Sequence, residues 1–280
     1  MTNTYFIIKT IINNKKIYYY LILEEKKREV IIKIGGLKNQ CIRIIINKKA
    51  KIGYIEDLVY KKECSIFNEI NKGSESSKNS IALLLKCSLI FCINKYPEVS
   101  LYKISDMSYI QCSNYQRISL SDLYVIKYNK SWYEKIFNAE PVEEQIKDVE
   151  RGKELILEKL NSEINLDLEE FINRYYIYTK SLNINKNLEH IKIAYKKNIK
   201  VKDYLSYFLN NNLDCRLYLL FFQMIFGYIM YGKFWQISKK VIKDYNINIE
   251  SYETEYIDNH ANLENLYKQL NEINNNHSSI

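Results

Sequence analysis

Apolar residues form short β-branched and aromatic runs in the first part of the chain and helix-spaced runs later. Five early runs rich in Ile, Val and Tyr alternate with short polar turns, which is typical of an antiparallel meander. The runs cover residues 5–12, 17–23, 28–34, 41–46 and 51–59. Two of them, 17–23 and 41–46, lack a clean apolar–polar alternation. Strands that are apolar on both faces are usually central or covered on both sides, so we expect another element to cover this sheet.

The most apolar stretch after the meander predicts a helix from Ile81. Its apolar residues at 81, 84, 85, 89 and 92 share one face at helical spacing, and further apolar positions widen that face. Ser80 or Asn79 can cap the first turn, because a side-chain oxygen accepts from a free amide there. We expect this helix to cover the sheet.

Beyond Pro97, the pattern predicts a strand over residues 99–104 and two short helices, about 120–127 and 132–138. Ser119 and Ser131 are each followed three residues later by an acidic residue, which matches a capping box. The two helices are expected to separate at Asn129, and Pro141 ends this part of the chain.

The second half carries apolar residues at helical spacing throughout. The segments are 142–160, 166–182, 187–197, 201–209, 217–230 and about 263–273. The run at 217–230 is shorter than a membrane span and contains Gln223, so we expect a core helix there. The expected fold class is α+β, with a mostly antiparallel sheet and helices over residues 1–140 and an all-helical domain over 141–280.

Composition adds a strong bias toward Ile, Asn, Lys and Tyr, which are products of A/T-rich codons, with only 7 Gly and 2 Pro in 280 residues. The net charge is +8. Residues 1–140 carry 23 basic and 13 acidic side chains, so this half holds a charge of +10. An anionic partner such as nucleic acid would meet the first half. A solvated lysine surface is the alternative explanation.

The six cysteines are scattered, and none forms a C-x-x-C pair, so no metal site is expected. The first residues lack a basic segment followed by an uninterrupted apolar run, so no secretory signal is expected. We therefore expect a cytoplasmic protein with reduced cysteines that lie mostly in the core.

A small polar loop, residues 71–80, leads directly into the helix at Ile81. Free amides and a partial positive charge at a helix N-terminus suit a phosphate group. The loop has one glycine and no following Gly-Lys-Ser/Thr sequence, so a plain surface loop is the alternative.

The order of meander, central strand, loop, helix, strand and aromatic helix resembles the GNAT-type N-acetyltransferase fold. The segment 133–137, Tyr-Glu-Lys-Ile-Phe, is similar to the Leu-Tyr-x-Lys-x-Gly-Phe-like sequence of that family's last helix. The segment 51–59 looks like the family's central strand, and 72–80 lies where its pyrophosphate loop would be. The sequence around Trp132 also looks like divergent GNAT-like proteins of large DNA viruses, in which a helical region follows.

The resemblance implies an acyltransferase that uses acetyl-CoA as acyl donor. It implies Tyr133 as the general acid for the departing thiolate, and Glu56 or Asp57 as the general base. The cofactor loop would comprise Lys72, Gly73, Ser74, Ser76, Ser77 and Lys78. The family's glycine-rich signature is absent, and Glu75 occupies a position where phosphates would sit.

Three functions therefore stay open. The missing glycines favour a degenerate GNAT-like scaffold whose helical half binds a protein partner. The second possibility is an acyl-CoA-dependent N-acyltransferase that transfers an acetyl group to an amine. The third is a basic nucleic-acid-binding module that uses the first half, with an affinity that falls steeply with salt.

Overall fold

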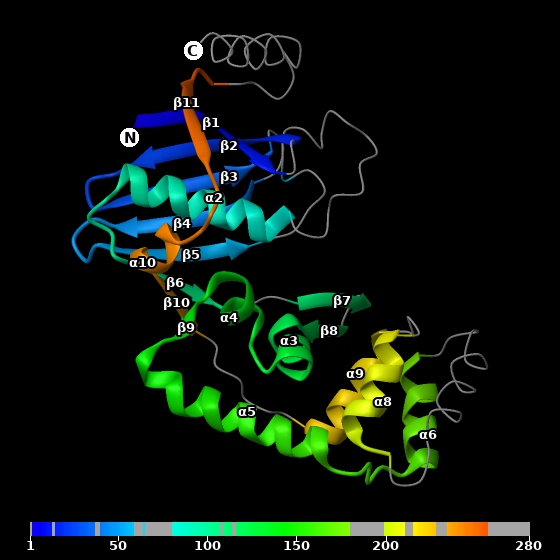
Figure 1. Cartoon of the computed structure of the whole chain (residues 1–280). Helices are drawn as coiled ribbons and strands as arrows, with labels where there is room; N and C mark the ends of the chain where they lie inside the picture. The colour runs from blue at the N-terminus through cyan, green and yellow to red at the C-terminus, as the bar shows by residue number, and fades with distance from the viewer. Residues whose placement is uncertain are drawn as a thin grey trace. The chain divides into compact units, whose positions relative to one another are not determined.

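A computed structural model gives the fold of the chain (Figure 1). The chain divides into two compact units, one comprising Met1–Ile104 and Ile237–Ile280 and the other Ser105–Gln236. The structure describes residues 2–12, 15–36, 40–58, 64, 80–106, 109–113, 116–179, 199–210, 215–227 and 234–256.

A nine-stranded, mostly antiparallel sheet has the order β11-β1-β2-β3-β4-β5-β6-β10-β9. The meander is confirmed, because β1 to β5 are paired in chain order as antiparallel neighbours. The strands are β1 Thr2–Ile12, β2 Lys15–Glu25, β3 Glu29–Gly35, β4 Gln40–Asn47, β5 Ile52–Leu58, β6 Leu101–Ser105, β9 Glu140–Pro141, β10 Phe234–Ser238 and β11 Ile249–Thr254.

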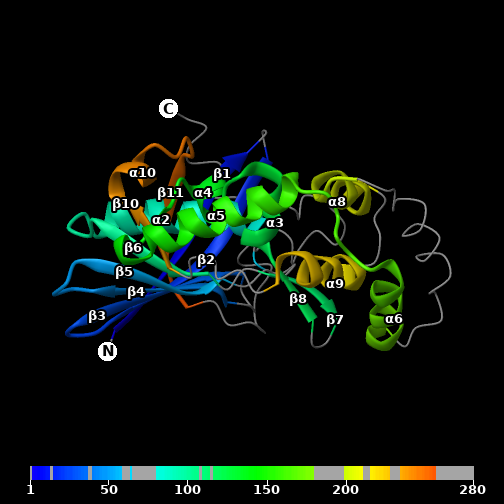
Figure 2. The same cartoon turned by 90° about the horizontal axis from the view of Figure 1, so that it is seen from below.

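The predicted apolar helix is α2, Ser80–Lys95, and it covers one face of the sheet (Figures 1 and 2). Leu84, Leu85 and Leu89 are fully buried, and the ring of Phe91 meets Phe6 of β1 edge-on at 5.3 Å between centroids. The expectation that this helix closes the core over the sheet is confirmed. The proposed caps at Asn79 and Ser80 fall where the structure does not describe side chains.

Strand β6 follows α2 and runs parallel to β5, as a strand–helix–strand connection requires. Gly53 of β5 pairs with Tyr102 of β6, whose side chain is fully buried. A Cβ atom at Gly53 would lie 2.3 Å from Cδ1 of Tyr102. The glycine in this strand is therefore required by the close approach of the tyrosine ring.

In the second unit, the two predicted short helices are α3, Leu120–Tyr128, and α4, Trp132–Phe137. The predicted capping box of α4 is present, since Ser131 and Glu134 each accept from the other's backbone amide. Ser119 caps α3 through the amide of Asp122. The helices separate at Asn129, which adopts a left-handed conformation with φ of 53°.

Four further helices of this unit surround an apolar core. They are α5 Ile146–Asn161, α6 Leu168–Thr179, α8 Val201–Asn210 and α9 Cys215–Phe226, and a short 3-10 helix, η2 Glu143–Gln145, precedes α5. Phe171, Tyr204 and Phe221 lie fully buried at its centre. A two-stranded sheet, β7 Tyr109–Ser113 and β8 Gln116–Ser119, completes the unit. The helices predicted at 187–197 and 263–273 lie outside the described residues.

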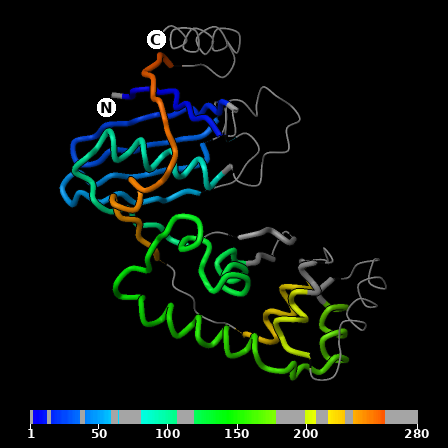
Figure 3. Tube along the Cα trace, in the orientation of Figure 1, coloured from blue at the N-terminus to red at the C-terminus, as the bar shows by residue number. Residues whose placement is uncertain are grey.

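The second half of the chain is not all helical, and the boundary expected at residue 140 differs from the observed division into units. Strands β10 and β11 both follow residue 230, and between them lies α10, Lys239–Lys243. Strand β11 pairs with β1, where the Lys9 Nζ donates to Glu250 at 2.9 Å. Figure 3 shows this late segment, in orange, beside the blue first strand. Lys9 and Glu250 are 241 residues apart in sequence, so the local sequence pattern did not indicate this pairing.

One cysteine expectation is wrong. Cys41 of β4 and Cys64 form a disulfide with a Cα–Cα distance of 5.7 Å, so these two are not reduced thiols. Cys87 and Cys92 of α2 are free and buried, as expected for core residues. The 23-residue separation of the bonded pair carries no spacing signal, which is why the sequence did not indicate it.

We predict that Gly53→Ala destabilises the first unit by about 1–3 kcal/mol, because the added methyl group overpacks against Tyr102. Chemical denaturation of the single variant, of Tyr102→Ala and of the double variant measures this. The double variant should lose clearly less than the sum of the two single losses. Additive losses would show that the two side chains do not compete for space.

We also predict that Cys41→Ala lowers the free energy of unfolding by about 2–4 kcal/mol, through loss of the disulfide. Reductant should lower the melting temperature of the wild type but leave that of Cys41→Ala unchanged. Peptide mapping without reductant should recover the Cys41 and Cys64 peptides joined. Alkylation of both thiols in unreduced protein would contradict the bond.

Candidate functional site

Two basic turns lie at the same end of the sheet in the first unit. Residues 26–28 connect β2 to β3, and residues 48–51 connect β4 to β5. Alternate connections of an antiparallel meander fall at the same end, which places these turns together. The amide of Lys48 donates to the carbonyl of Arg28 at 3.0 Å and joins the two turns directly.

Asn47 shapes the second turn. Its Oδ1 accepts from the amides of Lys49, at 3.0 Å, and Ala50, at 2.9 Å. Such an Asx-type turn satisfies backbone donors locally. Lys51 closes the turn in the left-handed region, with φ of 54°, and its amide donates to the Asn47 carbonyl at 2.9 Å. The turn residues are thus held by short-range hydrogen bonds that leave the lysine side chains outside.

An open hollow of about 620 Å³ lies between the two turns. Its lining consists of Lys27, Arg28, Asn47, Lys48 and Lys49. Four of these five side chains are cationic, and the fifth is engaged with the backbone of its own turn. The hollow therefore presents positive charge to solvent with no apolar side chain in its lining.

Carboxylates neutralise only part of this charge. Lys26 pairs with Glu29 at 2.6 Å, and Lys48 pairs with Glu25 at 3.4 Å. The structure gives no ion pair, within the residues it describes, for four exposed cations of the turns: Lys27, Arg28, Lys49 and Lys51. These four side chains concentrate positive potential at one end of the sheet, where an anionic partner would be attracted.

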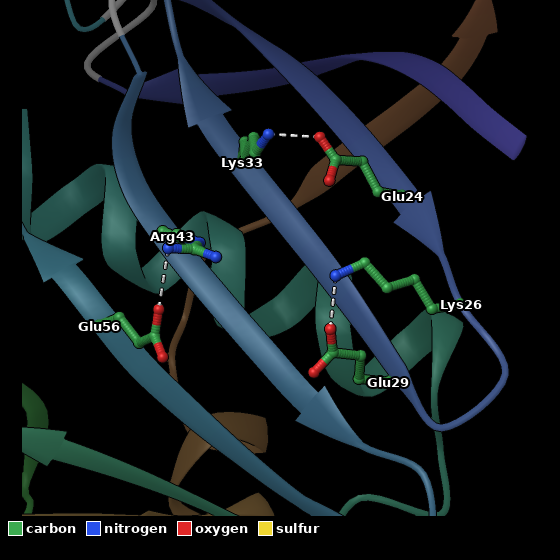
Figure 4. A network of polar contacts seen from close by, with 6 residues as sticks. All are labelled: Glu24, Lys26, Glu29, Lys33, Arg43 and Glu56. Atoms are coloured by element: carbon green, nitrogen blue, oxygen red, sulfur yellow. Dashed lines mark hydrogen bonds and ion pairs between the residues drawn. The ribbon is translucent and has the colours of Figure 1, made fainter. Parts of the chain in front are cut away.

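Cations on the strands differ from those in the turns. Figure 4 shows Lys33 beside Glu24 on the neighbouring strand, and Arg43 with Glu56 at 3.2 Å. Cross-strand pairs of opposite charge compensate each other on the sheet surface. Lys33 and Arg43 are therefore compensated by carboxylates, whereas the four turn cations named above have no ion pair among the described residues.

The sequence-predicted site residues lie elsewhere. Glu56 and Asp57 are exposed on the second half of β5, toward the end that leads to the predicted phosphate loop. The predicted loop residues Lys72, Gly73, Ser74, Ser76, Ser77 and Lys78 all lie outside the described residues. The basic turns lie at the other end of β5, about 20 Å away for a strand of this length.

Tyr133, the expected general acid, belongs to the second unit and is 1% exposed. Its ring lies 4.9 Å from that of Trp132 and stacks on Trp235 at 6.1 Å between centroids. Phe137 completes this aromatic group. The tyrosine ring thus has a packing role in the core that the sequence resemblance did not indicate.

A second polar group lies around the start of α3. Ser121 donates its hydroxyl to Asp106, and burial together with the Asp106 charge raises the pKa of Asp122 to about 7. The buried hydroxyl of Tyr218 on α9 has no hydrogen-bond partner among the residues described. Burial and the Asp122 charge also raise the pKa of Tyr218. The burial of Asp122 and its repulsion by the Asp106 charge make this group sensitive to pH.

Other chemistry finds little support in the described ranges. They contain no group of three or more His, Cys, Asp or Glu side chains that could hold a metal ion. No helix among them is long and apolar enough to cross a membrane.

Sequence reasoning missed the basic hollow as a site. The turns at 24–27 and 47–49 and the charge of +10 in the first half were visible signals. The sequence did not show that the two turns lie next to each other, because this depends on the register of the hairpins. Comparison with known proteins adds no further guide: no family model, no curated protein and no solved structure matches the chain.

The raised pKa of Asp122 predicts a pH-dependent stability. The folded state holds this proton up to about pH 7, whereas the unfolded chain releases it near the ordinary carboxyl pKa of 3.8. The contribution of this residue to stability therefore falls as pH rises from about 4 to 7, and the penalty persists above that.

Asp122→Asn should remove the penalty and stabilise the protein at pH 8 by roughly 1–4 kcal/mol. Its stability should also vary less between pH 4 and 7 than that of the wild type. Denaturation across this range measures both effects, with the exposed Asp148→Asn as control. Equal pH dependence in wild type and Asp122→Asn would contradict the assignment.

Proposed function

We propose that this chain is a GNAT-like protein that acts as a binding scaffold rather than an enzyme, and that its basic hollow holds an anionic partner. The observation that carries this proposal is that Lys27, Arg28 and Lys49, three exposed turn cations without ion pairs in the described part of the chain, line an open hollow. Such a surface attracts anions and accelerates their encounter.

The order of elements supports the GNAT-like part of the proposal. A meander leads into β5, and β5 is followed by α2, the parallel strand β6, the strands β7 and β8, and then α3 and α4. Apart from β7 and β8, this is the order that the resemblance implies. The helix α4 carries the Tyr133 segment on which the resemblance was based.

Several features support a binding role over catalysis. The Tyr133 ring is enclosed by aromatic neighbours, and Glu56 is paired with Arg43. Asp57 adds an exposed carboxylate in the half of β5 that leads toward the predicted cofactor loop. A carboxylate beside a pyrophosphate group would repel it. The basic hollow lies at the opposite end of β5 from Glu56 and Asp57.

The alternative is an acyl-CoA-dependent N-acyltransferase. The parallel β5–β6 pair joined through α2 favours it, because a helix that begins after a strand and loop directs its N-terminus toward the strand's end. In that case acetyl-CoA would be the acyl donor at the loop 72–78, with Tyr133 as acid and Glu56 as base.

Titration calorimetry separates these two functions. We expect tripolyphosphate to bind the wild type and to bind Lys27→Gln/Arg28→Gln at least several-fold more weakly. The control Lys16→Gln removes an exposed cation at the other end of the sheet and should bind normally. Acetyl-CoA should give no specific heat. Tight acetyl-CoA binding that is lost in Gly73→Asp would contradict the scaffold and support the enzyme.

A further inference from the structure

The basic surface extends beyond the hollow along the same end of the sheet. The amide of Ser100 donates to the carbonyl of Lys51 at 3.4 Å, and the Ser100 carbonyl accepts from the amide of Lys239 at 2.9 Å. Lys239 begins α10, whose next residue, Lys240, is exposed. Hydrogen bonds therefore link the two turns to the start of α10, and cations occur at each place.

The spacing of these cations suits an extended anion. Strands β3 and β4 are neighbours, so the β2–β3 and β4–β5 turns are centred two strand spacings apart, about 10 Å. One strand of a nucleic acid duplex advances about 3.4 Å per phosphate, so this distance covers about three phosphates. A single small phosphate would use only part of such a surface.

The means of binding also favours a polymer. The amides of Lys49 and Ala50 already donate to Asn47, and the amide of Lys48 donates to Arg28. These backbone donors cannot form a cage around one phosphate group. Recognition must come from lysine and arginine side chains, which is the way proteins neutralise a phosphodiester backbone.

Two other anionic surfaces fit less well. Membrane-binding basic segments add apolar side chains that enter the lipid, whereas the hollow has no apolar residue in its lining. An acidic protein partner would need an aromatic or apolar anchor in a pocket, and the lining contains none. The absence of an aromatic ring in this lining also excludes base stacking there.

We infer that this end of the sheet binds the phosphodiester backbone of nucleic acid without reading its sequence, through Lys27, Arg28, Lys49, Lys51 and Lys240. This inference rests on the proposed function, because it names the chemical class of the anionic partner. Base identity has no part in it, so duplexes of different sequence bind alike.

Fluorescence anisotropy with a labelled 20-base-pair duplex of arbitrary sequence tests the inference. Five neutralised phosphates give a slope of about −4.5 in the logarithm of the binding constant against that of salt concentration. Affinity should therefore fall about 500-fold between 50 and 200 mM salt. Two duplexes of unrelated sequence should give the same binding constants.

Variants that remove positive charges test whether these lysines cause the salt dependence of duplex binding. Lys27→Gln/Lys49→Gln should reduce its magnitude to about 2.7, and Lys240→Gln to about 3.6. Lys16→Gln should leave it unchanged. All the substituted side chains are exposed, and unchanged melting temperatures confirm that each variant is folded.

The outcomes distinguish this inference from the proposed function. The inference is overturned if Lys27→Gln/Lys49→Gln binds the duplex with the same affinity and the same salt slope as the wild type. The inference is also overturned if tripolyphosphate or phosphatidylserine vesicles bind at the hollow and the duplex does not bind at all. The proposed anion-binding function would then still stand. If neither duplex, tripolyphosphate nor vesicles bind at 50 mM salt, both the inference and the proposed function fail.

Discussion

The packing of α2 against the central strands is the interaction on which the first unit depends. The helix contributes Leu84, Leu85 and Leu89 to a core in which they are fully buried. Because α2 crosses the sheet between β5 and β6, it brings the chain back to the end at which β5 begins, and β6 can then run parallel to β5. The ring of Tyr102 then fills the space that Gly53 leaves open. Burial of this apolar surface is the main source of the free energy that holds the strands in register.

That register separates two ends of the sheet with different charge. The turns at 26–28 and 48–51 gather uncompensated cations at one end, while Glu56 and Asp57 occupy the half of β5 near the other. Cations thus lie at the start of β5 and carboxylates in its second half. In the proposed scaffold, the anion binds at the cationic end, and the GNAT resemblance would place a cofactor beyond the other end. In the proposed function, the anion binds to side chains of the turns and not in a pocket in the core.

Local signals made much of the fold predictable. The meander followed from β-branched runs between polar turns, α2 from apolar residues at helical spacing, and the break between α3 and α4 from Ser131, Glu134 and Asn129. Each of these features is determined within a few residues of the chain, which is why the sequence alone indicated them.

Features that depend on distant partners were missed. Strand β11 exists because it pairs with β1, and the bond between Cys41 and Cys64 depends on how the chain folds back. The hollow needs two turns whose residues are about 20 apart in sequence but joined by one hydrogen bond from Lys48 to Arg28. Composition indicated a basic first half, yet only the register shows which cations come together and which, like Lys33, are paired.

Lysine footprinting tests most directly the claim that the turn end of the sheet is the binding surface. Amine-reactive labelling of the wild type, followed by mass spectrometry, would be compared with and without a 20-base-pair duplex at low salt. The account predicts strong protection of Lys27, Lys49 and Lys51, with no change at Lys16 at the other end of the sheet. Equal protection at all exposed lysines, or protection only at Lys16, would contradict it.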